Sequence, residues 1–275
     1  MNIKKEKYPT IYLIGSFGNG WRDEVIDSLA DFDFNDPRNH QQSSITRLDY
    51  SDMKAAMESD IALTTIPNGK RAGTMSYCEL GGARAKGKCI IAIDENENKD
   101  SLLKKIASHH YSTREGVLEL LRENEYKPKY PKIKTKDKTK IRDEYQNILF
   151  AGDLQTIEPL IKEMEKTKKV LRGRNPKNLE NFSEETDLIV VNFDNGKPHE
   201  KHGLFYMGVG YATKVPILEL EGNSVPYPPL LGLARRVLVG RDRFKQAKEY
   251  LTNLKSQHID DEALVYYNLM KKFNN

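Results

Sequence analysis

Cysteine is scarce in this sequence, which has only Cys78 and Cys89 among 275 residues. Two cysteines cannot by themselves form a disulfide scaffold or a zinc site, and they suit a reducing cytoplasm. Long hydrophobic runs are missing as well, since none approaches the ~20 residues that span a bilayer. The first residues, Met-Asn-Ile-Lys-Lys, lack the apolar core of a signal peptide. We therefore expect a cytoplasmic protein without a membrane partner.

A strong charge of either sign is also absent. Lysine and arginine number 44 against 40 aspartate and glutamate, a net charge of +4, which is too small to indicate a nucleic-acid-binding protein. Apolar sequence, in contrast, is sufficient for a core, because 38% of the residues are hydrophobic. A length of 275 residues fits one large domain or two of ordinary size.

The first half alternates segments typical of strands and of helices. Residues 10–14, 60–66 and 89–93 are short apolar runs typical of buried strands. Trp21, Val25 and Leu29 recur at helical spacing, and residues 76–86 also favour a helix. Strands that alternate with helices predict βαβ units and a parallel sheet, hence an α/β, Rossmann-like fold.

The pattern starts again after a lysine-rich segment. Residues 127–140 contain seven lysines, two prolines and one acidic residue, and we interpret residues 127–144 as a solvated linker. Beyond it, three apolar runs repeat the strands of the first half: 147–152, 187–191 and 215–218. Residues 206–214 align with the first half when Gly210 is matched to Gly81.

The sequence therefore predicts two tandem Rossmann-like domains, each a mostly parallel sheet flanked by helices. They occupy residues 1–126 and 145–275, and the second is a degenerate copy of the first. Two further helices are expected near 244–254 and 260–272 from their apolar spacing.

Three pieces of the first domain are predicted to meet, because loops after the carboxyl ends of parallel strands share one edge of the sheet. They are the glycine-punctuated turn 15–20, the stretch 52–60 and the turn 73–79. Each also has a purely structural interpretation. The glycines can make a tight turn, Asp52 can cap a helix, and Ser76 with Glu79 can form a capping box.

In order and spacing, these pieces resemble the nucleoside 2-deoxyribosyltransferase family and its relatives, the deoxynucleoside 5'-phosphate N-hydrolases. The first match is Ile-Tyr-Leu-Ile-Gly-Ser at 11–16, and the second is Asp52, eight residues before Asp60 at the start of a strand. The third runs from Gly73 to Lys88 and carries Glu-Leu-Gly-Gly-Ala-Arg-Ala-Lys-Gly-Lys, where family members have Glu-Leu-Gly-x-Ala-x-x-x-Gly-Lys. The resemblance covers residues 10–95 well and the remainder only through the repeat.

The resemblance implies cleavage or transfer at the N-glycosidic bond of a nucleoside or nucleotide. Glu79 would be the nucleophile at the anomeric carbon and would form a glycosyl-enzyme intermediate. Tyr12 would orient that carboxylate, and Asp52 would protonate the departing base as a general acid. We expect no cofactor and no metal. In the family a neighbouring subunit completes each site, so we expect either a homodimer or a second domain that serves as a built-in partner.

One departure from the family bears on the substrate. The transferases that act on free nucleosides have an aspartate six residues before the catalytic glutamate, where this chain has Gly73. Thr74 follows, and Lys70 and Arg71 stand just before. A glycine, a hydroxyl and nearby cations would accept a phosphate that a carboxylate would repel, which favours a nucleoside 5'-monophosphate. The predicted substrate-binding residues are Gly15, Ser16, Gly18, Gly20, Asp60, Gly73 and Thr74.

The second domain lacks every predicted catalytic group. In the sequence alignment Gly208, Leu179 and Leu149 stand in place of the catalytic residues Glu79, Asp52 and Tyr12. We expect its role to be structural.

Other interpretations stay open. A nucleotide-binding sensor would keep the sheet and the pocket without turnover. A phosphoribohydrolase of the cytokinin-activating type has a loosely similar Gly-Thr-x-x-Glu motif. Nucleic acid could bind the lysine-rich segment, although no regular aromatic interleaving supports this. The histidines at 109–110, 199 and 202 lack cysteine or acidic neighbours at metal spacing, so surface or capping roles are favoured. The Asp36-Pro37-Arg38 turn either lines the pocket or is a plain turn.

Overall fold

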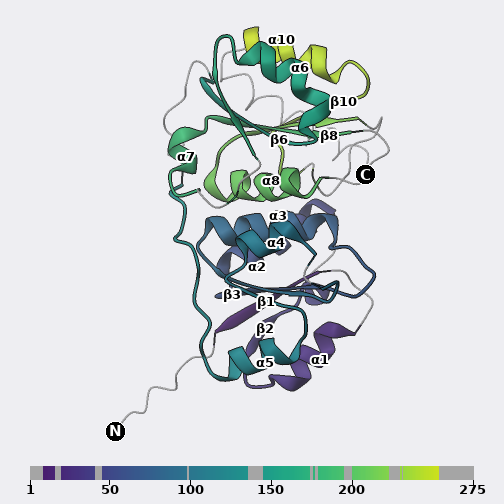
Figure 1. Ribbon diagram of the computed structural model, residues 1–275, viewed down its shortest axis with the longest axis vertical. Coiled ribbons are helices and arrows are strands. Elements are labelled where there is room, and N and C mark those ends of the chain that lie inside the picture. The colour runs from purple at the N-terminus through teal and green to yellow at the C-terminus, as the bar shows by residue number, and fades with distance from the viewer. Residues whose placement is uncertain are drawn as a thin grey trace. The chain divides into compact units, whose positions relative to one another are not determined.

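The computed structural model describes residues 9–15, 20–40, 45–97, 99–135, 145–173, 176, 179–194, 200–222, 230 and 232–253. The chain divides into two compact units between residues 132 and 133, and each is a Rossmann-like sheet with helices on both faces (Figure 1). The predicted linker 127–144 straddles this division, and the helix predicted near 260–272 lies outside the described residues.

The first unit alternates strands and helices as the sequence predicts, with additional short elements. In chain order it contains β1 (Thr10–Ile14), α1 (Trp21–Ser28), β2 (Asp33–Asn35), the 3-10 helix η1 (Pro37–Asn39), α2 (Ile45–Glu58), β3 (Ile61–Ile66), α3 (Thr74–Ala85), β4 (Cys89–Asp94), α4 (Ser101–Ile106), β5 (His109–Tyr111) and α5 (Glu115–Arg122).

The strand order of the first sheet is β2-β1-β3-β4-β5, and every neighbouring pair is parallel. The strand order reverses between β1 and β3. After β1 the chain adds β2 on one side of the sheet, and after β3 it adds β4 and β5 on the other side. In open α/β sheets, ligands bind in the crevice at such a switch point, outside the carboxyl ends of the strands. The topology therefore directs attention to the loops that follow β1 and β3.

Alternation along the strands separates two faces of the first sheet. Ile11, Leu13, Ile61, Leu63 and Ile91 point to the face covered by α1 and α5 and form a buried cluster there. The intervening residues point to the opposite face, which α2 and α3 cover (Figure 1). Helices α2 and α3 approach closely because α3 has a glycine at their contact. A Cβ on Gly82 would lie 2.8 Å from Cε of Met53.

The start of the lysine-rich segment packs on the first unit. The guanidinium of Arg84 lies 4.2 Å from the centre of the Tyr130 ring and donates to the Pro131 carbonyl oxygen at 3.1 Å. The Tyr130 hydroxyl donates to the carbonyl oxygen of Lys105 at 2.6 Å. Residues 127–132 therefore behave as part of this unit, although their composition alone is typical of a linker.

The second unit contains β6 (Asn147–Gly152), α6 (Leu154–Met164), β7 (Lys169–Arg172), α7 (Phe182–Glu185), β8 (Leu188–Phe193), α8 (Lys201–Thr213), β9 (Ile217–Glu221), β10 (Arg236–Val239) and α10 (Arg243–Asn253). Its strand order, β10-β9-β8-β6-β7, is that of the first unit with β6 in place of β1 and β8 in place of β3.

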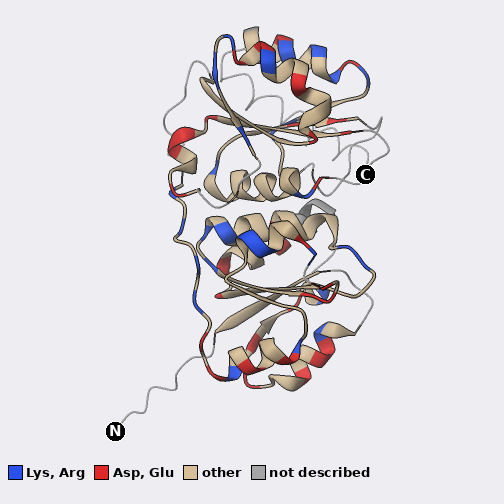
Figure 2. Ribbon diagram, in the orientation of Figure 1, with Lys and Arg blue, Asp and Glu red and all other residues tan. Residues whose placement is uncertain are grey.

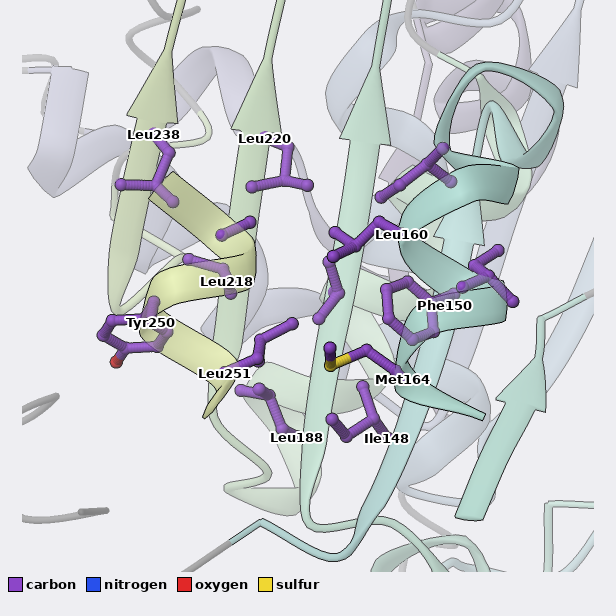
Figure 3. Close-up of a cluster of buried hydrophobic side chains, with 14 of the residues drawn as sticks. Ile148, Phe150, Leu160, Met164, Leu188, Leu218, Leu220, Leu238, Tyr250 and Leu251 are labelled. Carbon is purple, nitrogen blue, oxygen red and sulfur yellow. The ribbon is translucent and has the colours of Figure 1, made fainter. Parts of the chain in front are cut away.

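The core of the second unit lies between its sheet and helices α6 and α10. Ile148, Phe150, Leu218 and Leu220 of the strands pack there with Leu251 of α10 (Figure 3). Alternation then places Glu219 of β9 on the opposite face of the sheet, the face that α8 covers.

Helix caps correct the alignment of the two halves. Lys88 N donates to Ala83 O and Val215 N to Gly210 O, both at 3.0 Å, so the two helices end in the same way. The residue before each donor is left-handed: Gly87 has φ 68° and Lys214 has φ 61°. Matching Lys214 to Gly87 places Tyr206, not Gly208, at the position of Glu79. The sequence alignment was wrong by two residues here, but the second unit still has no carboxylate at this position.

Charge is distributed unevenly over the helices of the second unit. Figure 2 shows acidic and basic residues along α6 and α10, whereas α8 carries a charged residue only at its start, Lys201. Residues 203–210 of α8 are all buried, as expected of a helix that is apolar on every side. Despite this apolar character, the described part of the chain has no helix long and apolar enough to cross a membrane.

Candidate functional site

Tyr12 lies in the middle of β1 and faces α2 and α3, because its neighbours Ile11 and Leu13 fill the opposite face. Its side chain is completely buried, with 0% exposed, and its hydroxyl lies close enough to the Asp52 carboxyl group for each to act on the pKa of the other. Burial, and then the negative charges of Glu79 and Asp52, raise the pKa of Tyr12 well above its usual value. The hydroxyl therefore stays neutral and presents a hydrogen-bond donor beside two carboxyl groups.

Asp52 lies in the interior of α2 and does not cap a helix, so that structural interpretation is wrong. Its Oδ1 lies 2.6 Å from Nδ1 of His40. Burial raises the pKa of Asp52, while the hydrogen bond and charge of His40 oppose the rise, as do Tyr12 and Arg22. A carboxyl group whose pKa is raised retains its proton to higher pH, as a general acid requires.

Glu79 lies in the second turn of α3 and is 5% exposed. The capping-box interpretation is wrong, because the N-cap of α3 is Gly73 and Ser76 already lies inside the helix. The charge of Glu79 raises the pKa of Tyr12, and it opposes the lowering of the Arg22 pKa by burial. The structure thus brings Tyr12, Asp52 and Glu79 together from β1, α2 and α3, as the sequence predicts.

Arg22 also belongs to this group, although the sequence does not predict it. It extends from α1, is 3% exposed, and donates to the carbonyl oxygens of Gly15 at 2.6 Å and Leu13 at 3.3 Å. Burial lowers the pKa of Arg22, and the charges of Asp36 and Glu79 counter this. The sequence gives little indication that Arg22 is buried. It shows only an arginine directly after Trp21, at the start of a helix whose apolar spacing is amphipathic. A buried cation here complements the negative charge of Glu79.

His40 was also missed. It follows η1, and its ring is parallel to that of Tyr12, with 4° between the planes and 6.1 Å between the centroids. Nε2 of His40 lies 2.8 Å from Oδ1 of Asn35, on the edge strand β2. The Asp36-Pro37-Arg38 turn just before His40 is the only local sequence feature that could have pointed to this residue. That turn forms η1, with Asp36 as its N-cap and Arg38 bonded to the Asp36 carboxylate.

Four of the predicted binding residues lie at the expected turns. Gly15 follows β1 with φ 149°, and Gly20 is the left-handed N-cap of α1 with φ 66°. Gly73 is the N-cap of α3 and Thr74 is its first residue, with no side chain capping that helix end. Ser16 and Gly18 lie outside the described residues. The nearby Lys70 and Arg71 are exposed.

Asp60 does not belong to the site, and its prediction as a substrate-binding residue is wrong. It stands before β3, at the amino end of the sheet, whereas the site lies toward the carboxyl ends. Its Oδ2 accepts a hydrogen bond from Thr10 N at 3.0 Å. Asp187 makes the matching bond to Asn147 N at 2.9 Å in the second unit. The aspartate fixes the start of the first strand in both sheets.

Metal-ligating residues are dispersed. Across the described ranges, no three His, Cys, Asp or Glu residues come together in a way that could hold a metal ion. His109 and His110 form part of strand β5 rather than a helix cap, and burial lowers the pKa of both. His202 pairs with Glu200, with 2.7 Å between Nδ1 and Oε1, and His199 lies outside the described residues.

Comparisons with known proteins add little to this geometry. No protein-family model and no curated protein matches the sequence. Among solved structures, the chain is similar to a protein described as sugar-binding from Salmonella typhimurium LT2, at 10% identity and a TM-score of 0.28. That match covers 92% of this chain and 87% of the other. It is also similar to an acyclic imino acid reductase in complex with NADPH and D-Arg. Here the identity is 9% and the TM-score 0.22, with 93% and 94% of the two chains covered. At such TM-scores neither likeness informs the function.

Proposed function

We propose that the first unit cleaves or transfers across the N-glycosidic bond of a nucleoside 5'-monophosphate or nucleoside, through Glu79 as nucleophile and Asp52 as general acid. The observation that carries this proposal is the placement of the Tyr12 hydroxyl. It is fully buried beside two carboxyl groups of different character, Asp52 and Glu79, whose negative charges raise the pKa of Tyr12. Burying a hydroxyl together with two carboxyl groups costs free energy that apolar side chains would not, so a merely structural role does not account for this grouping.

The two carboxyl groups differ in a way that suits the chemistry. Burial raises the pKa of Asp52, which favours the protonated form. Glu79 acts as a negative charge on both Tyr12 and Arg22. An ionised carboxylate can stabilise an oxocarbenium-like transition state and capture it, while a protonated one supplies the leaving group with a proton. Arg22 would supply a positive charge, and the Tyr12 hydroxyl a hydrogen-bond donor, beside the Glu79 carboxyl group.

The proposed preference for a 5'-phosphate rests on the start of α3. Gly73 contributes no side chain there, and no side chain caps the helix. The amides of a helix start and its dipole favour an anion. A carboxylate at this position would oppose a phosphate but could bind a free 5'-hydroxyl.

A substrate panel tests both parts of the proposal. The intact protein is incubated with nucleosides and nucleoside 5'-monophosphates, in ribose and 2'-deoxyribose forms, and free base is followed by chromatography. We expect base release, fastest from a monophosphate, and we expect Gly73→Asp to shift the preference toward the free nucleoside. Binding of a nucleotide without release of any base would replace the proposed activity with a sensor role. Equal rates on phosphorylated and free substrates would contradict only the phosphate preference.

A further inference from the structure

His40 is held between two polar groups that come from different elements. Its Nδ1 lies 2.6 Å from Oδ1 of Asp52 on α2, and its Nε2 lies 2.8 Å from Oδ1 of Asn35 on β2. The side chains of His40 and Asp52 are only 14% and 11% exposed. Both ring nitrogens are therefore engaged, and little solvent competes for either bond.

The orientation of the ring is also fixed by neighbours that belong to the site. Asn35 is paired with Tyr12 in the register of β1 and β2. The Tyr12 ring lies parallel to the imidazole, and the backbone N–H of His40 donates to the Pro37 carbonyl oxygen at 3.1 Å. These neighbours hold the imidazole between η1, α2 and β2, beside the strand that carries Tyr12.

We propose that His40 is a positioning residue for the general acid: it donates Nδ1–H to Oδ1 of Asp52, so that the transferable proton resides on Oδ2. This inference rests on the proposed function. In the chemical step, the bond between the anomeric carbon and the base nitrogen breaks, and the Oδ2 proton passes to that nitrogen. A bond forms between the anomeric carbon and the Glu79 carboxylate. The negative charge that began on Glu79 ends on Asp52, where the Nδ1–H of His40 stabilises it.

The groups around Asp52 determine how activity should depend on pH. Burial raises the pKa of Asp52, and the opposing groups are His40 beside η1, Tyr12 on β1 and Arg22 on α1. Glu79 on α3 acts on the site through Tyr12 and Arg22. Loss of His40 removes the largest opposing influence, so the pKa of Asp52 should rise further. A weaker acid keeps its proton to higher pH but transfers it less readily.

The test compares His40→Gln with a matched control, His202→Gln. His202 makes the same kind of bond to a carboxylate, Nδ1 to Oε1 of Glu200 at 2.7 Å, but lies in the second unit. The pH dependence of kcat and kcat/KM is measured for both variants on the best substrate of the panel. For His40→Gln we expect kcat to fall about tenfold or more, KM to change little, and the alkaline limb to move to higher pH. For His202→Gln we expect the wild-type profile.

A second measurement is independent of turnover. A long-range ¹H–¹⁵N correlation spectrum of the wild-type protein, with the His40 signals assigned by their loss in His40→Gln, should show a proton on Nδ1. An unprotonated Nδ1 would overturn the proposal whatever the kinetics.

The outcomes separate this inference from the proposed function. Base release by the wild-type protein with an unmoved pH profile in His40→Gln would overturn the positioning role alone, and would leave His40 as a tether between η1 and α2. An absence of base release from every substrate by the wild-type protein would overturn the proposed function, and the positioning role with it.

Discussion

The guanidinium of Arg22 donates to the carbonyl oxygen of Gly15 across 2.6 Å, and so joins the first turn of α1 to the loop that leaves β1. The same side chain lies 3.9 Å from the Asp36 carboxylate and 4.7 Å from the centre of the Trp21 ring. A single buried cation thus connects three segments at the carboxyl end of the first sheet. The negative charge of Glu79 also acts on Arg22 and partly offsets the lowering of the Arg22 pKa by burial.

Replacement of Arg22 by methionine should destabilise the first unit, because the Gly15 and Leu13 carbonyl oxygens would lose a buried donor and Asp36 a buried partner. We expect a loss of about 2–4 kcal/mol in the free energy of unfolding. Urea denaturation followed by the fluorescence of Trp21, the single tryptophan, measures it. Arg122→Met is the matched control, since Arg122 also donates to a carbonyl oxygen but is exposed. Equal effects of the two substitutions would contradict the structural role given to Arg22.

Helices α3 and α8 end in the same way, so substitutions at the equivalent positions Gly87 and Lys214 should change stability in opposite directions. At Gly87 an added Cβ would lie 2.7 Å from Lys132 N, and φ is already positive at 68°. Gly87→Ala should therefore cost about 1–3 kcal/mol. Lys214 adopts φ 61° with a side chain, so Lys214→Gly should leave stability unchanged or raise it by up to ~1 kcal/mol. Thermal unfolding of both variants, followed by circular dichroism, checks the difference. A loss in both, or in neither, would count against the shared helix end.

Glu219 should make the stability of the second unit depend on pH. Its two carboxylate oxygens are buried and make no hydrogen bond to the described residues, and burial together with the charge of Glu221 raises the pKa of Glu219 to about 8. In the unfolded chain Glu219 has its ordinary pKa of 4.5. At pH values between 4.5 and about 8 the folded protein therefore holds a proton on Glu219 that the unfolded chain has lost. Stability attributable to this group therefore falls as pH rises from about 4.5 to about 8.

The substitution Glu219→Met removes the titrating group at similar volume. We expect it to stabilise the protein by about 2 kcal/mol or more at pH 8.5 and by clearly less at pH 5. Urea denaturation at the two pH values measures both differences. The same gain at both values would show that Glu219 does not titrate in this range.

The central strands were predictable because they bury both faces. The strands β1, β3 and β4 are near-continuous apolar runs, and so are β6 and β8. The edge strands β2 and β5 were missed, because three residues such as Asp-Phe-Asn or His-His-Tyr carry no periodicity of their own. They form only because a neighbouring strand supplies their hydrogen-bond partners.

The candidate site was predictable only in part, because the order of residues in the sequence does not show which of them lie close together in space. The proximity of Tyr12, Asp52 and Glu79 was predictable because their order and spacing carry a family resemblance. Asp60 was wrongly grouped with them, because sequence distance does not show at which end of the sheet a residue stands. Arg22 and His40 act through contacts with backbone oxygens and with other elements, and no local pattern reveals such contacts.

The most direct test of the account is base release by Glu79→Gln beside the wild-type protein and Glu58→Gln, in which an exposed glutamate near the end of α2 is replaced. Glutamine keeps the size of the side chain at position 79 but cannot form the glycosyl ester. We expect Glu79→Gln to bind nucleotide yet release base at least ~10³-fold more slowly, and Glu58→Gln to match the wild type. Undiminished release by Glu79→Gln would contradict the account.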